Sequence, residues 1–261
     1  MRHTSARNLL VAAAFLAGLA YLAPVGAADP TDDEFKSLVE QDAKVMVGAA
    51  DAVDKAASPK EKKVVAKNAG SGIKSSALLV ATYANTRIAG KDKTADAKAA
   101  GVRDEALKIY KAAADGNFKE AAELAKGLAS AKPAAEGKKI EFLKDLGEVT
   151  QKEVMHNFLK TPQYGTNVEA DIKANGKKAT AKPAETALMV HRVLAMGDLN
   201  KVVVKAEGAA DKKKWEDYNA KMIAATESLL TATKKKTSAA DLQKAFTLVD
   251  STCTACHDDF K

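Results

Sequence analysis

The chain has 261 residues, a formal net charge of +7, 46% hydrophobic and 5% aromatic residues, and two cysteines. The charge balance is only mildly basic and no stretch interleaves arginines with aromatic side chains, which argues against a nucleic-acid-binding protein. Alanine and lysine dominate, and proline and glycine cluster at a few places, so the composition predicts an all-α protein.

The first 30 residues have the three-part layout of a secretory signal peptide. Arg2 and Arg7 precede an apolar run at positions 9–23, and small residues follow it. The run is shorter than the roughly 20 residues that a membrane-spanning helix needs. We therefore expect residues 1–27 to be a signal peptide, and the mature chain to be soluble, periplasmic or otherwise exported, and without a membrane span.

The next segment, residues 28–133, is predicted to form a helical domain that contains neither cysteine nor histidine. Two short segments in it are similar in sequence to segments of the second half of the chain. "AKVMV" at 43–47 matches "KEVMH" at 152–156 with an offset of 109, and "SALLV" at 76–80 matches "TALMV" at 186–190 with an offset of 110. These two matches favour a duplicated and degenerate helical bundle. The alternative is an unrelated helical region packed on the second domain.

A polar stretch, "SAKPAAEGKK" at 130–139, is the predicted domain boundary. It leaves residues 138–261 as a C-terminal domain. The breaks at proline, glycine and lysine-rich positions divide this domain into four amphipathic helices, at about 138–161, 184–206, 212–235 and 238–260.

The last predicted helix carries both cysteines on its apolar face. That face is formed by residues spaced three and four apart: Leu242, Phe246, Val249, Cys253, Cys256 and Phe260. Ser238 and Asp241 have the spacing of a helix N-cap. The spacing Cys253-x-x-Cys256-His257 is typical of covalent c-type haem attachment. We expect one haem c per chain, with two thioether bonds and His257 as the proximal iron ligand.

The two cysteines have three other interpretations. A structural zinc site needs four ligands, and the spacing of His156, His191 and His257 does not supply the missing ones. A redox-active thiol pair is expected at the start of a helix, where the helix dipole lowers a thiol pKa, not near its end. A disulfide between residues three apart in a helix is geometrically awkward.

The C-terminal segment "SAADLQKAFTLVDSTCTACHDDFK" resembles the last helix of the cytochrome c′ and cytochrome c-556 family, and residues 213–233 resemble its third helix. The resemblance implies an antiparallel four-helix bundle with the haem at its C-terminal end. Lys261 stands where family members usually have arginine. The charge is kept, but the bidentate geometry of arginine is not, so Lys261 is a candidate contact at the haem edge.

The same resemblance extends to "QKEVMHNF" at 151–158 and implies the residue opposite His257. Met155 falls where c-556-type proteins have a methionine ligand and typical cytochromes c′ an apolar residue, so Met155 is the candidate sixth ligand. His156 is turned about 100° away on the helix and is expected at the surface. Met189 and Met196 are expected to fill the core, and His191 to be partly exposed.

These residues predict an electron-transfer protein rather than an enzyme, with no catalytic residue. With His257 and Met155 on the iron, the protein would carry single electrons to and from a redox partner protein, and an acidic partner could dock near Lys261. The first alternative is a five-coordinate haem protein that binds nitric oxide or carbon monoxide. The second is a non-haem exported helical protein with a thiol pair. The sequence leaves homodimerisation open.

Overall fold

A computed structural model describes residues 29–161, 164–204 and 206–260. The expected signal peptide and Lys261 lie outside these ranges. Within them all regular structure is helical, with nine α-helices, two short 3-10 helices and no strand. The prediction of an all-α protein is thus confirmed. In the same ranges we find no helix both long enough and apolar enough to cross a membrane.

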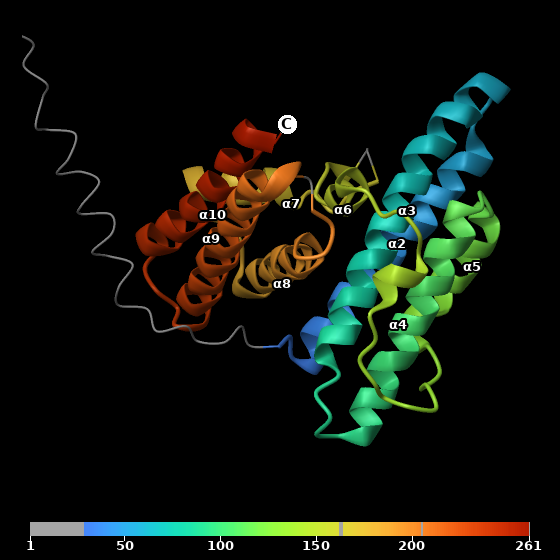
Figure 1. The fold of residues 1–261 in the computed structure, drawn as a ribbon, viewed down its shortest axis with the longest axis horizontal. Helices are drawn as coiled ribbons and strands as arrows, with labels where there is room; N and C mark the ends of the chain where they lie inside the picture. Colours follow the sequence, from blue (N-terminus) through green and yellow to red (C-terminus); the bar gives the residue numbers. More distant parts are fainter. Residues whose placement is uncertain (1–28, 162–163, 205, 261) are drawn as a thin grey trace, which may run out of the picture.

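The N-terminal half forms four helices joined by short loops, which lie side by side in Figure 1. Their bounds are α2 Asp32–Lys55, α3 Pro59–Arg87, α4 Lys93–Ala114 and α5 Phe118–Gly127. Local sequence explains where they begin. Thr31 and Glu34 form a reciprocal capping box at the start of α2, and Ser58 caps α3 directly before Pro59. We refer to α2–α5 as the N-terminal bundle.

The segment between the two halves contains little regular structure. After a 3-10 turn at Leu128–Ser130, the next helical pieces are a 3-10 turn at Phe142–Asp145 and α6, Gln151–His156. The prediction of a continuous helix at 138–161 is therefore wrong. Gly147 adopts a positive φ of 74°, which interrupts a helix, and a Thr150–Glu153 capping box starts the short α6 afresh.

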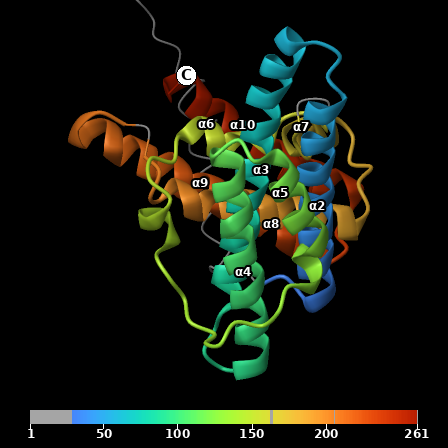
Figure 2. The ribbon, with the colours of Figure 1, turned by 90° about the vertical axis from the view of Figure 1, so that its right-hand side faces the viewer.

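The C-terminal half is built from four further helices: α7 Val168–Lys177, α8 Pro183–Asn200, α9 Gly208–Lys234 and α10 Ala239–Phe260. Helix α10 packs against α7 and α9, and α9 packs against α8. The three predicted helices at 184–206, 212–235 and 238–260 correspond to α8, α9 and α10, although α8 ends earlier. Helix α7 was not predicted. Figure 2 shows α9 crossing the direction of the N-terminal bundle.

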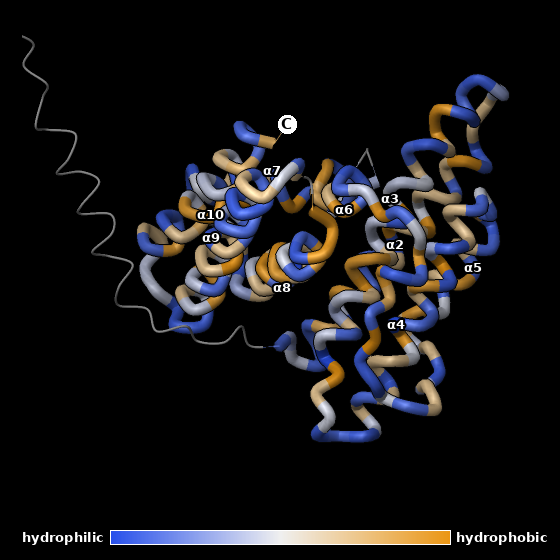
Figure 3. Tube along the Cα trace, in the orientation of Figure 1, coloured by the Kyte–Doolittle hydropathy of each residue, from blue (hydrophilic) through white to orange (hydrophobic). Residues whose placement is uncertain are grey.

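The apolar core continues from the N-terminal bundle into the C-terminal helices. Helix α8, largely orange in Figure 3, lies at this junction and packs against α2 and α3, while α6 packs mainly against α3. Arg192 on α8 forms an ion pair with Asp42 on α2 at 3.2 Å, and both side chains are buried. The two-domain division at 28–133 and 138–261 stays a prediction.

Candidate functional site

The four residues predicted to hold the haem and its iron line a single cavity of about 640 Å³. Cys253, Cys256 and His257 come from α10, and Met155 comes from α6. Helices α8 and α9 and the segment before α6 complete the walls. The other lining residues are Glu148, Val149, Thr150, Gln151, Lys152, Met196, Asn200, Val203, Val204, Trp215, Tyr218, Asn219, Met222, Thr252 and Phe260.

The apolar face of α10, which the sequence predicts, orients the cysteines toward the cavity. Phe246 and Val249 are fully buried, and one and two turns further on Cys253 and Cys256 are partly buried at the cavity. Both cysteines are free thiols. Burial raises the pKa of the Cys253 thiol to about 12, so this thiol is protonated at neutral pH. A protonated thiol is a poor nucleophile, which disfavours thiol–disulfide exchange as the role of the pair.

Helix α9 holds the end of α10 through aromatic and polar contacts. The ring of Phe260 packs edge-on against Trp215, with centroids 5.3 Å apart, and against Tyr218 at 6.3 Å. Asp259 accepts a hydrogen bond from the Tyr218 hydroxyl and pairs with Lys214 at 2.8 Å. These contacts fix the turn of α10 that carries His257.

Helix α8 approaches α9 closely beside the cavity. A Cβ atom added to Gly197 would lie 2.7 Å from Cγ1 of Ile223, so only glycine permits this spacing without a shift of that side chain. Asn219 donates from Nδ2 to the carbonyl oxygen of Gly197 at 2.9 Å, and Trp215 donates from Nε1 to the carbonyl oxygen of Asn200 at 2.8 Å. The contact brings Met196 to the cavity wall.

Helix α6 supplies the remaining wall. Met155 is partly buried and packs against the core. Gln151 donates from Nε2 to Oδ1 of Asn200 at 2.9 Å, which joins the start of α6 to the end of α8. Hydrogen bonds or packing thus connect α6 to α8, α8 to α9 and α9 to α10 around the cavity.

The rival ligands fall into two groups. Met196 lines the cavity, whereas His156, Met189 and His191 are not among its described lining residues. The expectations of a surface His156 and a partly exposed His191 were wrong, because the two side chains are only 7% and 4% exposed. Helix α6, which carries His156, packs on α3, and helix α8, which carries His191, packs on α2 and α3. Nε2 of His191 lies 3.6 Å from Oε2 of Glu34 on α2. Among the described residues no three His, Cys, Asp or Glu side chains cluster as a metal site would require.

Comparison with known proteins covers part of this site. The family model Cytochrome C' matches residues 173–261, so this part of the chain is similar to the cytochrome c′ family. Searches against curated proteins and solved structures give no match. The match begins inside α7, so it includes the cysteine pair and His257 but not α6 and Met155.

The cytochrome c′ family implies a covalently bound c-type haem, and the cavity fits such a group. Its volume lies within the roughly 300–1,000 Å³ of cofactor pockets, and methionine, valine and aromatic side chains form much of its lining. Two polar atoms on the wall, Oε1 of Gln151 and Oδ1 of Asn219, are buried without a hydrogen-bond partner in the described structure. Both atoms are hydrogen-bond acceptors.

Sequence reasoning missed the polar wall residues Gln151, Asn200 and Asn219. Nothing in the sequence marks them, because an amide side chain on an amphipathic helix is ordinarily solvated. Met222 and Trp215 also line the cavity. Their positions depend on how α8 and α9 pack, which the periodicity of one helix does not reveal.

Proposed function

We propose that this protein is an exported monohaem c-type cytochrome that carries single electrons. In this proposal Cys253 and Cys256 bind the haem through thioether bonds, and His257 and Met155 are its axial ligands. The observation that carries it is the convergence of these four side chains on one cavity, although Met155 is about 100 residues from the others in the chain.

The haem, when bound, supplies a one-electron Fe(III)/Fe(II) couple. The chain supplies the rest. The cysteines fix the group on α10, and the Trp215–Phe260 contact holds that part of α10 against α9. Met155 would bind the iron through its thioether, which would favour the reduced state and leave no site open to a gas. Methionine and aromatic side chains form much of the wall that the haem would contact.

The alternative is a five-coordinate, gas-binding protein, in which Met155 only packs in the cavity. The six-residue length of α6 is the observation that favours it, because a short helix can move away from the haem more easily than a long one. The two functions differ in whether carbon monoxide must displace a protein ligand.

Optical spectra of the purified full chain test the proposal. We expect a positive pyridine haemochrome assay for c-type haem, a low-spin spectrum in both oxidation states, and little change when carbon monoxide is added to the reduced protein. A negative haemochrome assay would refute haem binding itself. A high-spin reduced spectrum that shifts with carbon monoxide would instead establish the gas-binding alternative.

A further inference from the structure

Met155 lies on a helix that the N-terminal bundle holds in place. Helix α6 has only six residues, far fewer than the roughly 12–15 that an isolated helix needs for stability in water. Its position must come from tertiary contacts, and it packs more extensively on α3 than on α8. The contacts that fix Met155 are therefore to be found on α3 and α2.

Ser75 on α3 bonds the backbone on both sides of Met155. Its hydroxyl donates to the carbonyl oxygen of Val154 at 3.2 Å and accepts from the backbone N–H of Asn157 at 2.8 Å. Next to it, Lys74 donates to the carboxylate of Glu153. Val154 and Asn157 are buried, so these bonds do not compete with bulk water.

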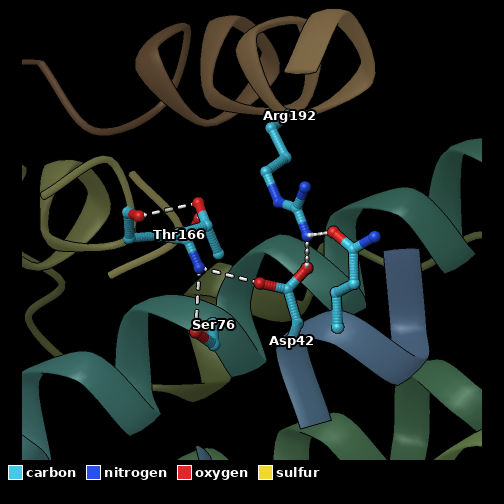
Figure 4. Close-up of polar contacts among 6 residues, drawn as sticks. Asp42, Ser76, Thr166 and Arg192 are labelled. Carbon is cyan, nitrogen blue, oxygen red and sulfur yellow. Dashed lines mark hydrogen bonds and ion pairs between the residues drawn. The ribbon is translucent and has the colours of Figure 1, made fainter. Parts of the chain in front are cut away.

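The side chain of Asn157, fully buried, is completely satisfied by the N-terminal bundle and the turn after α6. Its Nδ2 donates to Oδ1 of Asp42 and to Oγ of Ser76, both at 2.8 Å, and its Oδ1 accepts from Thr166 at 2.8 Å (Figure 4). The other oxygen of Asp42 binds Arg192 on α8. One carboxylate on α2 thus holds both α6 and α8.

Close packing supports the same conclusion. A Cβ atom added to Gly72 on α3 would lie 2.6 Å from Cβ and 2.7 Å from the carbonyl oxygen of Tyr164. Real Cβ atoms do not approach a backbone oxygen this closely, so the surface of α3 is recessed to receive the turn after α6. Tyr164 has a positive φ of 60°, which shows that the turn is held in an unfavourable conformation where it meets α3.

From these contacts we infer that the N-terminal bundle sets the axial ligation of the haem. Ser75, Gly72 and the Asp42–Asn157–Ser76 cluster are positioning residues: they hold Met155 at the cavity and are not among the described residues that line it. The inference rests on the proposed function, because it assigns the bundle a role toward the Met155 ligand. It also gives the haemless half of the chain a function.

Two substitutions in the full-length haem protein test this. Ser75→Ala removes the hydroxyl that brackets Met155, and Gly72→Ala forces the turn at Tyr164 away from α3. We expect each to raise the apparent carbon monoxide affinity of the reduced protein about tenfold. The loss of one hydrogen bond to a buried amide shifts an equilibrium by roughly that factor. The apparent affinity rises with the fraction of molecules in which Met155 has left the iron.

Matched controls separate positioning from general damage. Ser71→Ala, one turn before Ser75, removes a hydroxyl that bonds only its own helix, to the carbonyl oxygen of Lys67. Gly48→Ala on α2 adds a Cβ atom with nothing within 4 Å. Both should bind carbon monoxide as the unmodified protein does. Far-UV circular dichroism verifies that every variant is folded, and Ser76→Ala replaces Ser75→Ala or Gly72→Ala if either is not.

The decisive comparison repeats Ser75→Ala in a Met155→Ala background. If Ser75 acts through Met155, its tenfold effect disappears there. An effect of the same size in both backgrounds, or Ser75→Ala and Gly72→Ala variants that behave like their controls, would overturn the inference. The proposed function still holds after either outcome if Met155→Ala alone lets carbon monoxide bind the reduced protein. A protein without haem refutes both the proposed function and the inference.

Discussion

Arg192 on α8 and Asp42 on α2 form an ion pair in the interior of the protein, with side chains only 3% and 0% exposed and 150 residues apart in the chain. The pair joins the N-terminal bundle to α8, which forms one wall of the cavity. A buried charge is tolerated only when it is paired and hydrogen-bonded. Here Asn157 supplies a second donor to Asp42.

Removing one partner of this pair should be costly. We expect Arg192→Met to lower the free energy of unfolding by about 3–5 kcal/mol, because Asp42 is left buried without its cation. Asp42→Asn combined with Arg192→Met removes both charges and should recover much of that loss. Urea unfolding followed by circular dichroism measures both. A double variant that loses as much stability as Arg192→Met alone would contradict the expected recovery.

Met155 and its sequence counterpart Met46 should respond differently to the same substitution. Met155→Ala should convert a low-spin protein to a high-spin one that binds carbon monoxide, at small cost in stability because the side chain is only partly buried. Met46→Ala should cost about 2–5 kcal/mol, since Met46 is 0% exposed in the core, yet leave the visible spectrum unchanged. Optical spectra and urea unfolding give the two readouts. An unaltered spectrum for Met155→Ala would move the ligand to another residue, with Met196 the first to test.

Covalent attachment predicts that the haem stays with the polypeptide in acidified acetone. In a Cys253→Ala, Cys256→Ala double variant, any haem bound should be extracted, because both thioether bonds are lost. Thr254→Ala is the matched control, since Thr254 lies between the cysteines and is exposed. Retention of haem by the double variant would contradict the assignment of the cysteines.

His191 should make stability depend on pH. Burial, the main cause, lowers its pKa below the ordinary value of about 6.5, with Lys234 acting in the same direction and Glu34 opposing. The unfolded chain then binds more protons than the folded one as the pH falls through this value. The free energy of unfolding should thus decrease below about pH 6.5 and be fully regained above it.

Replacing His191 by Gln removes this titration. Thermal unfolding between pH 5 and pH 8 should show a smaller loss at the acid end for His191→Gln than for the unmodified protein. Glu34→Gln should steepen the loss, because it removes the carboxylate 3.6 Å from Nε2 that partly stabilises the charged imidazole. Parallel pH profiles in all three proteins would contradict the assignment to His191.

The parts of the fold that depend on local chemistry could be predicted. Helix α10 was expected at 238–260 and is found at 239–260, because its apolar spacing and the bond from the Asp241 N–H to Oγ of Ser238 are both properties of neighbouring residues. Cys253, Cys256 and His257 are neighbours on this helix, so their common place at the cavity could be predicted as well. Met155 at the cavity followed from a resemblance rather than from periodicity.

Long-range packing could not be predicted. The sequence at 138–161 suggested one helix, but Gly147 interrupts it. The short α6 that remains is held by hydrogen bonds from α3. Helix α7 lies between Pro162 and Pro183 in a polar segment. Its contact with α10, where Gly176 lies close to Thr247, brings together residues 71 positions apart.

The recessed surface at Gly72 also determines how the molecule comes apart. Because α6 is seated on α3 and at the same time forms a wall of the cavity, the N-terminal bundle cannot separate from the C-terminal helices without opening the site around Met155. Unfolding of the two halves is thereby made cooperative, with α6 as the shared element. A visible spectrum would consequently report the loosening of helices that contain no ligand at all.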